Sequence, residues 1–134
     1  MTPHKLLQAA LVVTGLLCCC LYPLALVWPS GWAWHDGPPA ASHYFMMIVG
    51  LYVTLGIFLI LAARDPYANR SLILFTIVSS LVHAAIMTVQ AAGDPMQHGH
   101  LVGDVPALVL AAAVLGGLLL LDRTDQASAA PAAQ

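Results

Sequence analysis

Four long apolar runs, with almost no charge inside them, restrict this chain more than any other feature of its sequence. They cover about residues 6–28, 44–63, 71–92 and 105–121. Each run is within the range of about 17–25 residues that an α-helix needs to cross a bilayer. Only 7% of the 134 residues are charged, whereas a soluble domain carries about 25%. We therefore expect an all-α integral membrane protein, in which residues 1–122 form a single four-helix bundle.

Two further features follow from residue composition along the chain. Pro23 lies inside the first run, where its ring removes one backbone hydrogen bond, so we expect a kink in that helix. Residues 123–134 consist mainly of Ala, Ser, Gln and Pro with no apolar period. Such a segment cannot bury enough apolar surface to fold, and it is predicted to be a disordered tail.

The basic residues predict the orientation of the four spans. All of them fall before the first span, between the second and third, or after the fourth: Lys5, Arg64, Arg70 and Arg123. Basic residues in short loops mark the cytoplasmic side, so both termini are predicted to be cytoplasmic. The lipid bilayer is then the expected partner. Nucleic acid is not expected, because the chain has no basic cluster and a net charge of −2.

The third run carries a polar stripe at helical spacing. Thr76, Ser80, His83 and Gln90 recur every three or four residues, together with Ser79 and Met87, and so share one face of a helix. That face should point into the bundle, while Leu72, Ile73, Ile77 and Leu81 should face lipid. His83 is expected roughly 10 Å below the outer surface. An ionisable side chain at that depth suggests a functional site, although hydrogen bonding between helices, ligand contact and proton transfer are all open to it.

More polar side chains gather near the outer ends of the spans. His43 begins the second span, and Asp104 begins the fourth, where it is placed to cap the helix. His98 and His100, separated by one glycine, could bind a transition metal if His43, His83, Asp94 or Asp104 completed the ligand set. We predict a ligand site formed by His43, His83, Gln90 and Asp104, with His98 and His100 as candidate metal ligands. A haem held between histidines of two helices is a narrower form of the same hypothesis.

Small residues suggest where helices approach each other. Gly50 and Thr54 form a small-xxx-small pair, and Gly56 and Gly116 add further thin points. We expect these positions to pack against other helices, and a homo-oligomer through Gly50 or Gly116 is a further option. The three adjacent cysteines at 18–20 point about 100° apart on a helix, so they cannot converge on one metal ion, and they are interpreted as packing residues.

Residues 43–120 resemble a known group of sequences. The resemblance is carried by Gly50 and Gly56 in the second span, Arg64 and Pro66 in the following turn, Ser79 and His83 in the third span, and Gly103 and Asp104 at the start of the fourth. In these features the chain is similar to small four-helix bacterial inner-membrane proteins of unknown function that are distantly DoxX-like. The resemblance implies a multi-pass protein of the bacterial inner (cytoplasmic) membrane and no established activity.

Two classes of function fit these observations. The first is a small membrane protein whose outward-facing polar pocket binds a small ligand, a lipid or a metal, as an accessory subunit of a larger membrane complex or alone. The second is a membrane enzyme or small transporter in which His83 exchanges protons. No nucleophile elbow, phosphate-binding loop or metalloprotease motif is present in the sequence. The sequence thus leaves open whether the chain is an enzyme.

Overall fold

The fold is built from helices alone in the part of the chain that is described. The computed structural model describes residues 2–32 and 38–129, with side chains in these ranges up to Arg123. In these residues there is no strand. The elements, in chain order, are α1 (Pro3–Cys19), α2 (Leu21–Val27), η1 (Pro29–Trp32), η2 (Pro39–Ala41), α3 (His43–Ala62), α4 (Arg70–Gly93), η3 (Pro95–Gln97), α5 (Gly99–Val102) and α6 (Asp104–Ala129).

Three of the helices begin where the apolar runs begin. α3 and α4 agree with the expected spans to within one residue at each end, and α6 begins one residue early at Asp104. Ser42 caps α3 by accepting a hydrogen bond from the Phe45 amide at 3.2 Å. α6 continues to Ala129, into the segment expected to be a disordered tail, and residues 130–134 lie outside the described residues.

The first apolar run forms two helices instead of one kinked helix. α1 ends at Cys19, α2 begins at Leu21, and their axes are bent by 63°. Pro23 has no N–H to donate to the carbonyl of Cys19, so the hydrogen bonding of the helix is interrupted there. The predicted effect of Pro23 is confirmed, and it is a break and not a gentle kink.

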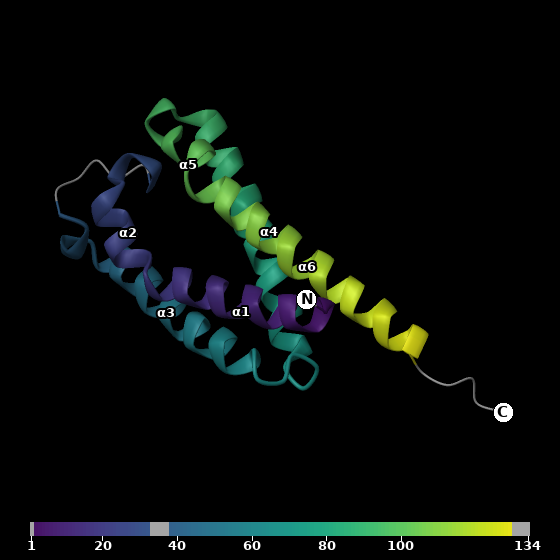
Figure 1. The fold of residues 1–134 in the computed structure, drawn as a ribbon. Helices are drawn as coiled ribbons and strands as arrows, with labels where there is room; N and C mark the ends of the chain where they lie inside the picture. The colour runs from purple at the N-terminus through teal and green to yellow at the C-terminus, as the bar shows by residue number, and fades with distance from the viewer. Residues whose placement is uncertain (1, 33–37, 130–134) are drawn as a thin grey trace.

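The helices associate as two pairs. α1 packs mainly on α3, and α4 packs mainly on α6, and Figure 1 shows the two pairs meeting where α1 approaches α6. The buried apolar core lies at this meeting point. Its members come from four helices: Leu7, Leu11, Leu59, Ala63, Ile73, Leu115 and Leu119.

Two glycines allow α1 and α3 to come close together. A Cβ atom on Gly56 would lie 2.5 Å from the carbonyl oxygen of Gly15, and one on Gly15 would lie 2.6 Å from the carbonyl oxygen of Gly56. No side chain fits at either position without moving backbone. Gly50 was expected to pack as well, but a Cβ atom there would meet nothing within 4 Å among the described residues.

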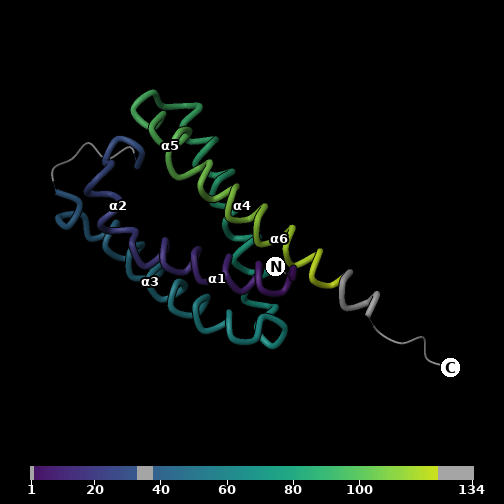
Figure 2. Tube along the Cα trace, in the orientation of Figure 1, coloured from purple at the N-terminus to yellow at the C-terminus, as the bar shows by residue number. Residues whose placement is uncertain are grey.

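The two ends of the fold differ in character. At one end, His4 and Tyr67 both contact Asp122, which gathers the start of α1, the α3–α4 connection and α6. Lys5, Arg64, Arg70 and Arg123 occur in these same three segments, so we name this the basic end. At the opposite end, η1 contacts α5, and a Cβ atom on Gly103 would overlap the backbone of Gly31. The Cα trace in Figure 2 shows the N-terminus and the α3–α4 connection at one end and α5 near the other.

Three helical segments are long and apolar enough to cross a membrane. They are His43–Ala62, Arg70–Gly93 and Pro95–Arg123, with mean hydropathies of 2.5, 2.2 and 2.2. The bent pair of α1 and α2 becomes a fourth if it is counted as one broken span. The chain therefore has the helix lengths and composition of a multi-pass membrane protein.

Candidate functional site

The polar stripe on α4 turns toward the protein interior, as expected. Thr76 and Ser80 are buried, and His83 is half-buried. The Thr76 hydroxyl donates to the carbonyl of Leu72 in its own helix at 2.9 Å, which satisfies it without a partner helix. The expectation for the opposite face holds for Leu81, which is exposed, but not for the other three residues. Ile73 is fully buried in the core between the two helix pairs, and Leu72 and Ile77 are half-buried and pack against that core.

His83 makes a hydrogen bond to the other helix pair. Its Nδ1 atom lies 2.7 Å from the hydroxyl oxygen of Tyr52 on α3. The two rings are tilted by 49°, with their centroids 6.1 Å apart. Sequence reasoning did not identify Tyr52, although it lies between Gly50 and Gly56 on a helix that was expected to pack closely against another. Since α3 and α4 otherwise contact each other little, this bond is a main link between them.

His100 and Asp104 form a second polar pair at the start of α6. Nδ1 of His100 lies 3.0 and 2.9 Å from the two carboxylate oxygens of Asp104, and its Nε2 lies 3.0 Å from Oε1 of Gln97. Asp104 is only 6% exposed. The imidazole of His100 therefore bridges Asp104 and Gln97: Nδ1–H donates to the carboxylate, and Nε2 pairs with the amide of Gln97.

The two pairs belong to one electrostatic neighbourhood. The Asp104 carboxylate hydrogen-bonds to His100 and also lies within electrostatic range of His83 and Tyr52. We name this set of five residues the outer polar cluster: Tyr52, His83, Gln97, His100 and Asp104. Its five residues come from α3, α4, η3, α5 and α6. None of these five residues belongs to the apolar core.

Three of the residues predicted for the ligand and metal sites lie apart from this cluster. His43, Gln90 and His98 are exposed, and none of them makes a hydrogen bond to another described side chain. Gln90 belongs to the last two turns of α4, where the stripe reaches the surface. The connection between the first and second apolar runs also carries polar and aromatic residues, but they lie outside the described residues: Trp34, His35 and Asp36. Of the predicted residues, the fold thus brings together His83, Asp104 and His100.

The two candidate metal ligands differ in their surroundings. Both ring nitrogens of His100 have side-chain partners, Asp104 at Nδ1 and the Gln97 amide at Nε2. His98 is exposed. Within the described ranges, no group of three or more His, Cys, Asp or Glu side chains is arranged to bind a metal ion.

A second polar cluster, at the basic end, was not anticipated from the sequence. Asp122 is 2% exposed. Its Oδ2 atom lies 3.2 Å from His4 Nδ1 and also accepts a hydrogen bond from the Tyr67 hydroxyl. The rings of His4 and Tyr67 stack with their centroids 5.5 Å apart. The available signal was Asp122 itself, a carboxylate that directly follows an apolar run on a helix.

Comparison with known proteins gives one match. Residues 1–131 match a family described only as a family of unknown function. No curated protein and no solved structure matches the chain.

Proposed function

Since the chain belongs to DUF6632, a family of unknown function, we propose from its own geometry that it is a small multi-pass membrane protein that binds an apolar ligand at His83. The observation that carries this proposal is the Tyr52–His83 hydrogen bond, which uses one ring nitrogen and leaves the other available.

Exposed apolar surface supports insertion into a bilayer. Only 22%, 17% and 22% of the three apolar windows is buried within the chain, although all three are strongly hydrophobic. Val27, Val89 and Tyr44 are 83%, 74% and 72% exposed. In water such a surface would cause aggregation, whereas lipid tails cover it at no cost. We propose four crossings, with α1 and α2 together forming one broken span.

The positions of the charges support one orientation. Lys5, Arg64, Arg70 and Arg123 all occur in the segments that meet at the basic end. By the positive-inside rule this end is cytoplasmic, and both termini are cytoplasmic with it. The outer polar cluster then lies toward the opposite face. We also propose, from the resemblance described above, that the membrane is the bacterial inner membrane and that the chain is distantly DoxX-like.

The hydrogen bonding of His83 supports a ligand that accepts a hydrogen bond. When the Tyr52 hydroxyl donates to Nδ1, the neutral imidazole has its proton on Nε2. Nε2 has no hydrogen-bond partner among the described residues, so its N–H is available to an acceptor. A ligand that reaches it from the bilayer must be mostly apolar. We therefore propose an apolar molecule with a carbonyl oxygen that accepts from Nε2–H.

The break in the first span provides further support. The break lies beside α3, where the Cys19 thiol is 3.8 Å from the carbonyl oxygen of Val53, the residue that follows Tyr52. In membranes, irregular backbone is tolerated where it is buried in protein or lines a cavity, and broken helices often surround binding sites. A broken helix beside Tyr52 and His83 is therefore consistent with a ligand site there.

Bound-ligand analysis tests the proposal. The protein is purified in a mild detergent, extracted with organic solvent, and the extract is quantified by mass spectrometry. We expect close to one equivalent of an apolar carbonyl compound per chain. His83→Ala should reduce it by about tenfold, the equivalent of one good hydrogen bond. His98→Ala removes an exposed histidine and serves as the matched control. Equal amounts in all three proteins would disprove the ligand site.

Proton exchange at His83 is the second candidate, and a separate observation favours it. Asp104 lies within electrostatic range of both His83 and His100. A series of ionisable groups, His100, Asp104 and His83, therefore runs from the end of the fold opposite the basic end to His83. In vesicles that contain a pH-sensitive dye, the purified protein should then accelerate collapse of an imposed pH gradient, and His83→Gln should abolish the acceleration. A wild-type rate no faster than that of empty vesicles would exclude this candidate.

A further inference from the structure

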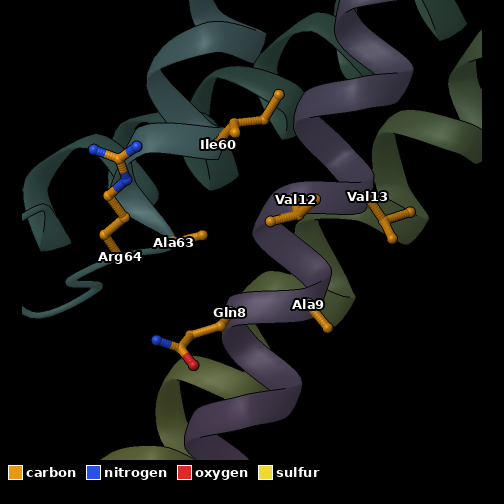
Figure 3. Close-up of a pocket in the computed structure, with 7 residues that line it drawn as sticks. All are labelled: Gln8, Ala9, Val12, Val13, Ile60, Ala63 and Arg64. Atoms are coloured by element: carbon orange, nitrogen blue, oxygen red, sulfur yellow. The ribbon is translucent and has the colours of Figure 1, made fainter.

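A surface groove between α1 and α3 lies at the basic end, away from the outer polar cluster. It has a volume of about 470 Å³, within the range of roughly 300–1,000 Å³ that is usual for ligand sites. The side chains that line it are mainly apolar, and the two polar ones are Gln8 and Arg64. The others are Ala9, Val12, Val13, Ile60 and Ala63. Figure 3 shows Gln8 and Val12 extending from α1 toward the side on which Ala63 and Arg64 lie.

The charge of Arg64 is not neutralised within the described structure. Its neighbour Asp65 uses Oδ1 to accept hydrogen bonds from the backbone amides of Tyr67 and Ala68. Asp122 is engaged by His4 and Tyr67. The ion pairs found among the described side chains involve only histidines as cations. An exposed guanidinium, which presents five N–H donors, therefore stands at the edge of an apolar groove.

The helix geometry adds a second cation on the same side. Lys5 precedes Ala9 by four residues on α1, and Ala9 lines the groove. Residues four apart share a helical face, so Lys5 lies one turn nearer the basic end than Ala9 does. Farther from that end, Val12, Val13 and Ile60 provide only apolar surface. The groove is thus cationic toward the basic end and apolar beyond it.

We propose that this groove binds one anionic phospholipid. Its phosphate accepts hydrogen bonds from the Arg64 guanidinium and the Gln8 amide, and one acyl chain lies along Val12, Val13 and Ile60. Arginine suits phosphate because its planar fork of donors bonds two oxygens at once. The proposal rests on the membrane placement given above and on the orientation of the basic end, but not on the ligand site at His83.

Native mass spectrometry of the detergent-purified protein with added lipid tests this inference. The probe is dioleoyl-phosphatidylglycerol, with dioleoyl-phosphatidylcholine as the zwitterionic comparison. The wild type should retain phosphatidylglycerol preferentially. Arg64→Ala should reduce its retention about fivefold, the factor expected for one basic residue near a membrane surface. Arg123→Ala, an equal loss of charge at the same end but outside the groove, should leave retention unchanged.

Three further arms separate this inference from its alternatives. Ala9→Trp fills the groove from an exposed position and should also reduce retention, whereas Ala85→Trp on α4 should not. Glycerol 3-phosphate, a headgroup without acyl chains, should not compete. His83→Ala should retain the lipid fully, so that failure of the ligand site would not affect this result. Equal retention by the wild type and Arg64→Ala, an equal loss in Arg123→Ala, or competition by glycerol 3-phosphate would overturn the proposal.

Discussion

Tyr52 and His83 provide a polar link between two helices that otherwise share little contact. A hydrogen bond between membrane helices contributes about 0.6 kcal/mol on average and up to about 1.7. We expect Tyr52→Phe to lower the free energy of unfolding by about 1 kcal/mol, measured by denaturant titration in mixed micelles. Tyr44→Phe, at a position that is 72% exposed, is the matched control and should change it little. Equal effects of the two substitutions would show that the hydrogen bond does not stabilise the fold.

Asp122 supports a larger prediction, because it is buried and accepts from two side chains. Asp122→Ala leaves the Tyr67 hydroxyl and the His4 ring without their acceptor. Each hydrogen bond contributes about 1 kcal/mol net, so we expect a loss of about 2 kcal/mol in the same titration. Arg123→Ala changes the adjacent, exposed residue and should be nearly neutral. A neutral Asp122→Ala would mean that this cluster does not hold α1 against α6.

Individual site residues could be predicted from the sequence only where a helical period exposed them. His83 was identifiable because it continues the stripe of Thr76 and Ser80 on one face. Tyr52 and His4 were not, since an aromatic residue in an apolar run and a histidine near a helix start have many ordinary roles. Their partners are distant in sequence, and only the meeting of the two helix pairs brings them together.

At the scale of helices, the closest approach in the fold is the crossing of α1 and α3 at Gly15 and Gly56. We expect Gly56→Ala to destabilise the protein by about 2 kcal/mol, because the added methyl group meets the backbone of Gly15 and overpacking typically costs 1–3. Gly50→Ala lies on the same helix in open space, and it should be neutral or stabilising by up to about 1 kcal/mol. Thermal unfolding followed by circular dichroism measures both. If Gly56→Ala unfolded at the wild-type temperature, the crossing would have to be looser than described.

The helices themselves were largely predictable, and their pairing was not. Length and hydropathy locate α3 and α4 to within a residue. In an apolar segment, a backbone N–H or C=O group outside a helix has no hydrogen-bond partner, which is energetically unfavourable in lipid. The same pattern does not say which faces meet. A residue such as Ile73 is apolar whether it contacts lipid or protein, and Gly50 and Gly56 look alike until one of them meets another backbone.

For the molecule as a whole, the topology is the central prediction. In a background with Cys18, Cys19 and Cys20 replaced by Ala, single cysteines are introduced at exposed positions as Ala68→Cys and Gly93→Cys. In intact cells, a membrane-impermeant maleimide should modify residue 93 and leave residue 68 unmodified, because the basic end is cytoplasmic. Both should react after the membranes are opened, which controls for reactivity. Modification of both residues in intact cells would contradict four crossings with this orientation.

The contact of Gly31 with Gly103 has a consequence for the history of this family. One glycine follows α2 and the other directly precedes Asp104, so a loop of the first helix pair presses on the residue beside a buried carboxylate. A side chain gained at Gly103 would overlap the backbone of Gly31, push the two loops apart and shift Asp104 relative to His100. Lineages that change Gly103 should therefore show a compensating change in the loop around Gly31. In such lineages, the two loops would evolve as one inherited unit.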